Sequence, residues 1–218
     1  MAAVKQSTSG SAQPHRGIHD SQANRIEVDF GTYHHSTAQE SNEIRQRAGR
    51  SFSALLGSLY PSGSSIRILD AGCGLGFLMQ VAAECFPKAH ITGVDLFEHG
   101  SISGISMDKA AKNMQSLGID SRTSFLKHNL AQLMESATQY DLVLSNLVFH
   151  NIGKARFKAY ANIFEALKPG AFFVIGDLFP DDKADMDYFR ERSTLINESD
   201  EGGAGPWKYK IKVLRKQS

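Results

Sequence analysis

A carboxylate and three glycines at the end of one apolar run have the types and spacing needed to bind a nucleotide. In the stretch ILDAGCGLGF, Asp70 is followed at alternate positions by Gly72, Gly74 and Gly76. Glycines permit a tight turn and let a ligand approach the bare backbone where a helix begins. The next apolar run, HITGVDL, holds a second acid, Asp95, at the distance of roughly 20 residues that suits a carboxylate binding a ribose diol. The sequence therefore predicts a nucleotide-like ligand.

Two features of this region argue against a dinucleotide. The position where a G-x-G-x-x-G fingerprint has its third glycine is occupied by Phe77. Asp70 would repel a pyrophosphate in a partly desolvated site, whereas a ligand with an ammonium group and no phosphate would suit it. S-adenosylmethionine has that character, because it combines a ribose and an adenine with an amino acid and a sulfonium. We therefore expect S-adenosylmethionine in preference to NAD.

Two further residues follow apolar runs and have side chains able to move or orient a proton. His150 lies in LVFHNI, just beyond the run YDLVLSN, and Asp177 ends the run AFFVIGD. Ligands bind at the carboxyl ends of strands in such sheets, so His150 is the candidate general base. The alternative for His150 is capping or packing of the following helix. For Asp177 the alternatives are orientation of a substrate and a bond to a loop amide.

A cluster of aromatic and histidine side chains lies near the N-terminus. The stretch FGTYHHST contains Phe30, Tyr33, His34 and His35. Adjacent histidines are expected to diverge and are poor evidence for a metal, so we predict no metal site. The cluster either folds over the cofactor or substrate, or forms an ordinary loop.

The elements that must position these residues alternate between strand and helix. Near-continuous apolar strands separated by amphipathic helices predict a parallel sheet covered on both faces, a doubly wound α/β fold. Two last strands, joined by the glycine-rich DEGGAGP, predict a C-terminal hairpin that places one antiparallel strand in the sheet. The expected strands are 66–69, 90–96, 123–129, the start of 140–149, 171–179, 193–199 and 207–215, and the expected helices are 43–59, 76–86, 106–117, 154–167 and 182–192.

Composition divides the chain into three parts. Residues 1–24 are polar and nearly free of large apolar groups, which predicts a disordered tail. Residues 25–63 form an N-terminal helical segment that we expect to close the pocket. Residues 64–218 form the main domain.

Charge and cysteine content limit the partners and the location. The 218 residues include 24 Lys and Arg against 23 Asp and Glu, a balance that gives no reason to expect nucleic acid. The tail KYKIKVLRK alternates basic and apolar residues, as a strand with one wet face does. Cys73 and Cys85 are the two cysteines, and with no secretory h-region and no apolar run of about 20 residues they favour a soluble, cytoplasmic protein without a membrane partner.

Five successive stretches resemble the motifs of class I S-adenosylmethionine-dependent methyltransferases. They are ILDAGCGLGFLMQVA, ITGVDLF, FLKHNLAQL, YDLVLSNLVFHNI and FEALKPGAFFVIGDLF, in the family's order and spacing. The resemblance implies the family's seven-stranded sheet, with the last pair of strands forming the hairpin.

The resemblance also implies a set of cofactor contacts. The first motif lines the methionine end, Asp95 binds the ribose, and Leu96 packs on the adenine. Asn129 stands where the family often has Asp, and its carbonyl can still meet the exocyclic amine of the adenine. The implied cofactor residues are Asp70, Ala71, Gly72, Cys73, Gly74, Gly76, Asp95, Leu96, Asn129, Leu130, Ser145 and Asn146.

Two departures bear on the substrate. Residues 97–106 intervene before the next helix and form a lid, a substrate loop or slack in the chain. The run SNLVFH replaces the Asn-Pro-Pro-aromatic motif that relatives acting on base amino groups usually have. We therefore expect a methyltransferase for a small molecule. The alternatives are a silent cofactor-binding regulator, a macromolecular methyltransferase and an NAD-dependent dehydrogenase.

Overall fold

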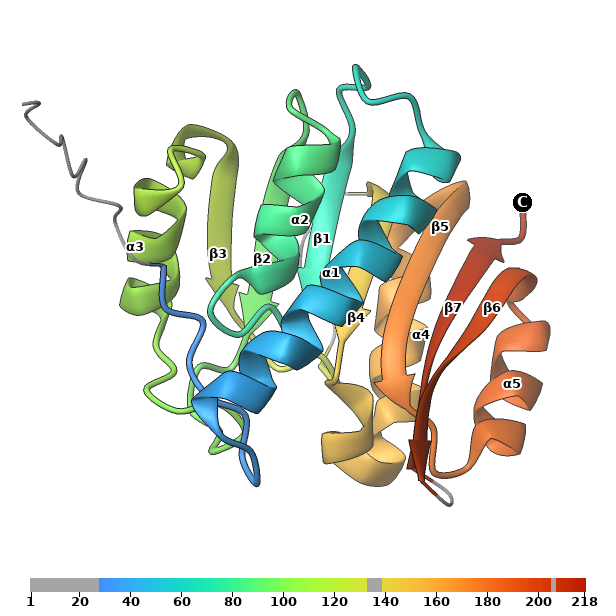
Figure 1. The fold of residues 1–218 in the computed structure, drawn as a ribbon. Coiled ribbons are helices and arrows are strands. Elements are labelled where there is room, and N and C mark those ends of the chain that lie inside the picture. Colours follow the sequence, from blue (N-terminus) through green and yellow to red (C-terminus); the bar gives the residue numbers. More distant parts are fainter. Residues whose placement is uncertain (1–27, 133–138, 205–206) are drawn as a thin grey trace, which may run out of the picture.

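Seven strands form one sheet in the computed structural model, which describes residues 28–132, 139–204 and 207–218 (Figure 1). The strand order is β3-β2-β1-β4-β5-β7-β6, and β7 is antiparallel to β5 and β6 while the other pairs are parallel. This confirms the doubly wound, mostly parallel sheet with a C-terminal hairpin. The predicted tail 1–24 lies outside the described residues. The strands are β1 (Arg67–Ala71), β2 (His90–Asp95), β3 (Thr123–Lys127), β4 (Tyr140–Asn146), β5 (Leu167–Leu178), β6 (Ser193–Ala204) and β7 (Trp207–Lys216).

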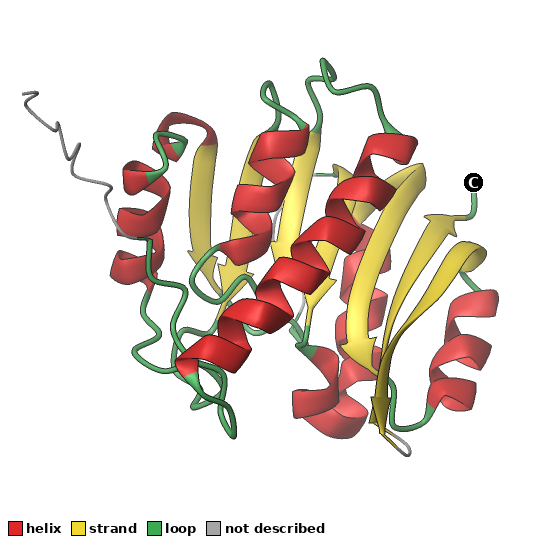
Figure 2. Cartoon of the chain, viewed as in Figure 1, coloured by secondary structure: helices red, strands yellow, loops and turns green. Residues whose placement is uncertain are grey.

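Helices cover both faces of the sheet (Figure 2). Helices α1, α2 and α3 lie on one face, with α4 and α5 on the other. No helix of the described residues is long and apolar enough to cross a membrane. The α-helices are α1 (Ala38–Leu59), α2 (Phe77–Cys85), α3 (Met107–Ser116), α4 (Arg156–Ala166) and α5 (Asp182–Arg190), with short 3-10 helices η1 (Asp120–Arg122) and η2 (Phe149–Ala155).

The strands supply a separate core to each face. Ile68 and Leu144 belong to the core under α1, α2 and α3, whereas their neighbours Leu69 and Val143 belong to the core under α4 and α5. All four side chains are fully buried. Because successive strand residues point to opposite faces, a strand buried on both sides needs a continuous apolar run. That requirement explains the pattern seen in the sequence.

Several expected boundaries were wrong, among them the start of β5, which lies at Leu167 and takes in the KPG expected to end the preceding helix. Helix α1 begins at Ala38, five residues before the expected start, because Thr37 and Glu40 form a capping box that ends the chain's extended segment there. The expected hairpin loop 200–206 is largely strand, since β6 continues to Ala204 and accommodates its glycines through a register shift between Asp200 and Gly203.

Candidate functional site

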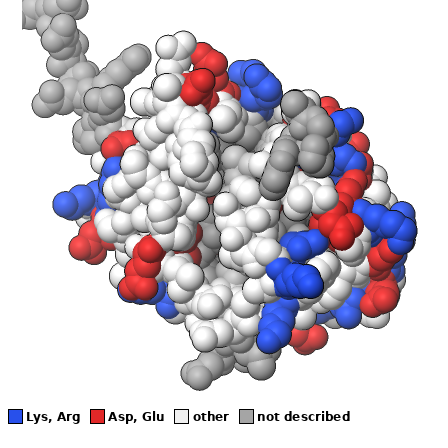
Figure 3. Space-filling view, turned by 90° about the horizontal axis from the view of Figure 1, so that it is seen from below, with Lys and Arg blue, Asp and Glu red and all other residues white. Residues whose placement is uncertain are grey.

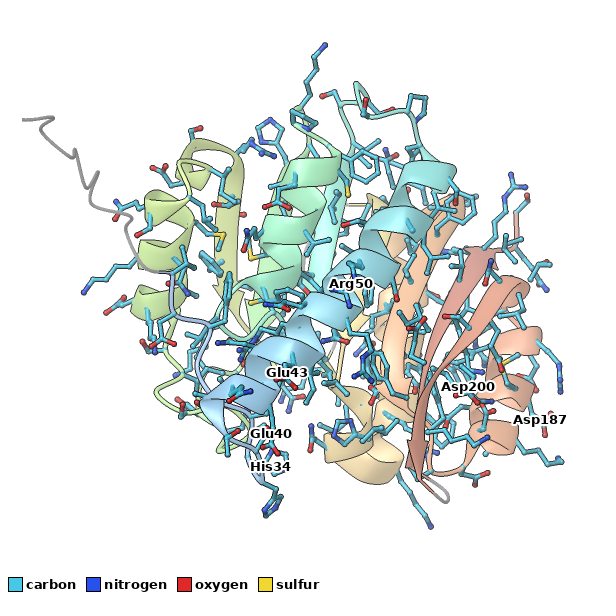
Figure 4. The ribbon with its side chains drawn as sticks, in the orientation of Figure 1. His34, Glu40, Glu43, Arg50, Asp187 and Asp200 are labelled. Atoms are coloured by element: carbon cyan, nitrogen blue, oxygen red, sulfur yellow. The ribbon has the colours of Figure 1, made fainter. Side chains whose placement is uncertain are left out.

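A cavity of about 840 Å³ lies at the carboxyl edge of the sheet. The ends of β1, β2, β4 and β5 supply part of its wall, and α1, α2, η2, β6, β7 and connecting segments also contribute. Seen from below, the middle of this face is mostly uncharged, and Lys, Arg, Asp and Glu gather toward its edges (Figure 3). Glu40 and Glu43 line the cavity from the first turns of α1, close to His34 (Figure 4).

The glycine turn after β1 brings bare backbone to the cavity wall. The amides of Gly72 and Cys73 both donate to the carbonyl of Val94, which fixes the turn against β2. Gly72 has φ 77°, and a Cβ there would lie 2.3 Å from a methyl of Val148. Gly76, with φ 91°, caps α2, and Met114 fills the space where its Cβ would be. Only glycine fits these two positions without displacing a neighbour.

Asp70 is a buried carboxyl with unused capacity for hydrogen bonding. Its side chain lines the cavity, yet the residue is 1% exposed, and Oδ2 has no partner among the described residues. Burial, together with the nearby charge of Asp95, raises the pKa of Asp70 to about 8. A cation placed beside this carboxyl would satisfy Oδ2 and restore the ionised form.

Asp95 is held in place by three donors. Its Oδ2 accepts from the amide of Gly74 at 3.0 Å, and its Oδ1 accepts from the amide of Phe97 at 2.7 Å. Oδ1 also lies 3.0 Å from Nε2 of His99. Burial alone would raise the pKa of Asp95, but these hydrogen bonds outweigh it and hold the pKa below its usual value.

The partly buried His150, at the cavity wall, pairs with the buried carboxylate of Asp177. Nδ1 of His150 donates to Oδ1 of Asp177 at 2.5 Å, and the His150 side chain is 13% exposed and lines the cavity. The amides of Val148, Phe149 and Leu178 also donate to the Asp177 carboxylate. Since Nδ1 is occupied, Nε2 is the ring nitrogen left to accept a proton.

Two tyrosines hydrogen-bond the side chain of Asn146, the last residue of β4. The hydroxyl of Tyr209 donates to Oδ1 of Asn146 at 2.6 Å, and Tyr33 also hydrogen-bonds the Asn146 side chain. All three residues line the cavity. Burial raises the pKa of both tyrosines, so they act as neutral hydrogen-bonding groups.

The N-terminal segment pairs with the connection after β2. Tyr33 and Ile102 form an isolated antiparallel bridge. The amide of His34 donates to the carbonyl of Ser101, and the amide of Ser103 donates to the carbonyl of Thr32. These two segments, which lie far apart in the sequence, therefore form one continuous part of the cavity wall.

Arg45 of α1 holds the N-terminal segment in place through its guanidinium group. It is 5% exposed and donates to the carbonyls of Phe30 and Gly31 at 2.8 and 2.6 Å. Its guanidinium carbon also lies 4.6 Å from the centre of the Tyr33 ring. The rings of His34 and His35 do not diverge as expected but meet edge to face at 4.7 Å, because His35 has φ 60°.

The structure brings about half of the predicted site residues to the cavity wall. Those that line it are Asp70, Gly72, Cys73, Asp95, Leu96, Asn146 and His150. Those outside the lining are Ala71, Gly74, Gly76, Asn129, Leu130 and Ser145.

The residues outside the lining have other contacts. Ser145 donates to the carbonyl of Ala71 and joins β4 to β1. Asn129 accepts from the amide of Ala131, and Leu130 lies in the core on the α4 side. Contact of Asn129 and Leu130 with an adenine therefore stays a prediction.

Sequence reasoning missed several lining residues. His99 follows Asp95 by four positions, and only its place in an unusual insertion could have drawn attention to it. Tyr209 and Glu201 come from the hairpin, and nothing in their local sequence indicates that β7 and β6 bring them to the cavity.

Comparisons with known proteins agree with this geometry. A family model described as "Methyltransferase domain" matches residues 62–204. The malonyl-[acyl-carrier protein] O-methyltransferase of Bacillus anthracis is 30% identical over 124 residues, which are 57% of this chain and 42% of that protein. A sterol 24-C-methyltransferase of Gibberella zeae is 27% identical over 132 residues, 60% of this chain and 32% of that protein. The chain therefore spans less than half the length of these two relatives.

A solved structure shows the same fold. The N-methyltransferase NodS from Bradyrhizobium japonicum WM9, in complex with S-adenosyl-L-homocysteine, has a TM-score of 0.58 and 19% sequence identity. The match covers 78% of this chain and 87% of that one. Because the family model covers more than half of the chain, the chain belongs to the methyltransferase domain family. Its class is that of the S-adenosylmethionine-dependent methyltransferases of class I.

Proposed function

We propose that this chain transfers a methyl group from S-adenosylmethionine to a hydroxyl oxygen of a small molecule, with His150 as the general base. The observation that carries the proposal is the contact of 2.5 Å between His150 and Asp177 at the cavity wall. A histidine fixed by a buried carboxylate serves catalysis when the acceptor must lose a proton as it is methylated.

The described residues fit the cofactor. Oδ2 of Asp70 is buried and unpartnered among them, which suits the ammonium of the methionine end. Gly72 lines the cavity without a side chain, so a ligand can approach its backbone. We assign the ribose to Asp95 and the adenine face to Leu96, which is 40% exposed at the cavity wall. When bound, the cofactor supplies an electrophilic methyl group.

The protein's own residues position the acceptor and remove its proton. Enclosure in the cavity aligns the acceptor oxygen with the methyl group. Nε2 of His150 takes the hydroxyl proton as the new carbon–oxygen bond forms. Asp177 stabilises the resulting imidazolium through Nδ1, and its three backbone donors keep it in position. Tyr209 and Asn146 offer further hydrogen bonds for orienting the acceptor.

A hydroxyl acceptor is favoured over a carboxylate. The relative from Bacillus anthracis is named for methyl transfer to malonyl-[acyl-carrier protein]. A malonyl carboxylate is already ionised near neutral pH and needs no base, whereas a hydroxyl does. Two arginines line the wall. Arg45 is engaged by two backbone carbonyls and is poorly placed to bind an acidic acceptor, so such an acceptor would have to use the exposed Arg47.

We also propose that residues 28–37 and 97–106 close the cavity over its ligands, as expected for the N-terminal segment. The bridge between Tyr33 and Ile102 supports this role, because both residues lie at the cavity wall. Cys73 and Cys85 are free thiols, in line with a reducing, cytoplasmic setting.

The experiment is a transfer assay that measures S-adenosylhomocysteine formed with a panel of hydroxylated, phenolic and malonyl-thioester acceptors. The proposal predicts turnover with one hydroxyl class and loss of turnover in His150→Gln, with binding of S-adenosylhomocysteine retained. Turnover only with the malonyl thioester would contradict the hydroxyl assignment. Binding without turnover on any acceptor would favour the silent regulator instead.

A further inference from the structure

The carboxylate expected to bind the ribose is already in use. Asp95 is 4% exposed, and its Oδ1 accepts from the amide of Phe97 and the ring of His99. Its Oδ2 accepts from the amide of Gly74. A carboxylate oxygen accepts about two hydrogen bonds. Oδ1 is therefore saturated and Oδ2 has room for one more donor.

A ribose diol brings two hydroxyl donors to this site. One of them can use the remaining capacity of Oδ2, but the second needs Oδ1. The amide of Phe97 belongs to the backbone that follows β2, whereas His99 reaches Oδ1 through a side chain from a connection without regular structure. His99 is therefore the donor that can leave.

The position of the His99 side chain beside Asp95 is unfavourable in free energy. Its second nitrogen, Nδ1, is buried without a partner among the described residues, although the side chain as a whole is 36% exposed. A buried polar atom without a hydrogen bond costs free energy that rotation into solvent would recover. Nearby, Phe97 adopts φ 56°, a left-handed conformation that is unfavourable for a bulky side chain. Both features favour a rearrangement once another donor reaches Asp95.

We propose that His99 competes with the ribose of the cofactor for Asp95 and swings away from it when the cofactor binds. The inference rests on the proposed function, because it takes Asp95 as the ribose-binding acid. His99 becomes a residue that sets cofactor affinity, in a connection whose role the sequence left undetermined.

Competition of this kind makes cofactor affinity depend on pH. The hydrogen bond to Asp95 raises the pKa of His99, against the effect of burial. Binding that breaks the pair returns this pKa toward its ordinary value and releases a proton. Affinity should therefore rise with pH between the ordinary pKa of histidine and the raised one, and level off above it.

Two other ionisable residues, Asp70 and Glu98, lie near the pair formed by His99 and Asp95. The charge of Asp95 helps to raise the pKa of the nearby Asp70. Glu98, next to His99, is paired with Lys127 of β3. Asp70 also titrates on binding an ammonium group, so the contribution of His99 is isolated by comparing variants at position 99.

The test is calorimetric titration with S-adenosylhomocysteine at pH values from about 5.5 to 8.5. His99→Ala removes the competitor and should bind about three- to tenfold more tightly than the wild type at low pH. His99→Gln keeps a donor for Asp95 but cannot titrate, so its pH profile should lose the step assigned to His99. Weaker binding by His99→Ala, or an unchanged pH profile in both variants, would overturn the proposal.

A spectroscopic readout separates this inference from the function on which it rests. In nitrogen-15 spectra of the histidine rings, the pKa of His99 should fall when S-adenosylhomocysteine is added. Normal binding with a constant or raised His99 pKa contradicts competition but leaves the proposed function intact. Failure of the wild type and both variants to bind S-adenosylhomocysteine contradicts the proposed function itself.

Discussion

Oδ1 of Asp177 lies 2.5 Å from Nδ1 of His150, although the two residues are 27 positions apart. The contact exists because β4 and β5 are parallel neighbours, with Asn146 of β4 beside Gly176 of β5. Parallel pairing brings the residues that follow each strand to the same edge of the sheet. Strand register thus brings the candidate base and the carboxylate proposed to orient it together at the cavity wall.

Removing the charge of Asp177 tests this pair. Asp177→Asn should lower kcat by about 10²- to 10³-fold, because the imidazolium loses its stabilising partner, while affinity for S-adenosylhomocysteine stays within about twofold. Asp187→Asn is the matched control, since Asp187 is exposed and, among the described residues, its carboxylate bonds Lys183 and Arg190 on its own helix. Equal kcat values for the wild type and Asp177→Asn would show that His150 is not a base.

The carboxyl of Asp70 should lower the stability of the free protein and strengthen binding of the cofactor. In the folded protein its pKa is about 8, against an ordinary value of 3.8. The unfolded state therefore ionises first, so this residue makes stability fall as the pH rises from about 4 to 8. Asp70→Asn should raise the free energy of unfolding at pH 7 by on the order of 1–3 kcal/mol and weaken binding of S-adenosylhomocysteine.

Thermal unfolding measured across this pH range provides the check for Asp70. The wild type and Asp70→Asn should have similar melting temperatures near pH 4 and should diverge as the pH rises. A variant that is less stable than the wild type at pH 7 would show that the carboxyl is ionised and well paired in the free protein.

The glycine turn should tolerate no side chain. Gly72→Ala combines a positive φ with a Cβ only 2.3 Å from Val148, so it should lower the free energy of unfolding by about 2–4 kcal/mol. Adding Val148→Ala should restore part of that loss. Gly57→Ala in α1 is the control, because no described residue outside its own stretch of helix comes within 4 Å of its Cβ position and alanine favours a helix.

Denaturant unfolding measures these three glycine-turn variants. The expected order of stability is Gly57→Ala at or above the wild type, then the double variant, then Gly72→Ala. A Gly72→Ala protein as stable as the wild type would mean that the turn adopts another conformation.

Asn113 should anchor residues 28–37, which together with residues 97–106 form the proposed cover of the cavity. Its amide donates to the carbonyls of Asp29 and Leu75, so it joins α3 to the N-terminal segment and to the glycine turn. Asn113→Ala should lower the free energy of unfolding by about 1–3 kcal/mol. It should also speed the exchange of backbone amide hydrogens in residues 28–37. Lys112→Ala, on the exposed face of the same helix, should change neither quantity. Unchanged exchange in the Asn113 variant would separate this residue from the cover.

Local pattern was enough to predict the order of the strands and the glycine turn, and it placed the candidate base at the carboxyl edge of the sheet. A buried parallel strand must be continuously apolar, and a helix start beside a ligand needs glycine, so both features are visible in short windows such as that around Gly72. The contact between His99 and Asp95 was not predictable, because it depends on how an irregular connection folds back. Tyr209 reached the site through the register of β7 against β5, which pairs it with Leu178. No local pattern specifies that register.

Calorimetric titration of the wild type and Asp95→Ala with S-adenosylhomocysteine and NAD is the most direct test of the cofactor site. We predict micromolar affinity for S-adenosylhomocysteine, a loss of at least tenfold in Asp95→Ala, and no binding of NAD. Binding of NAD without S-adenosylhomocysteine would contradict the assignment of this cavity to a methyl donor.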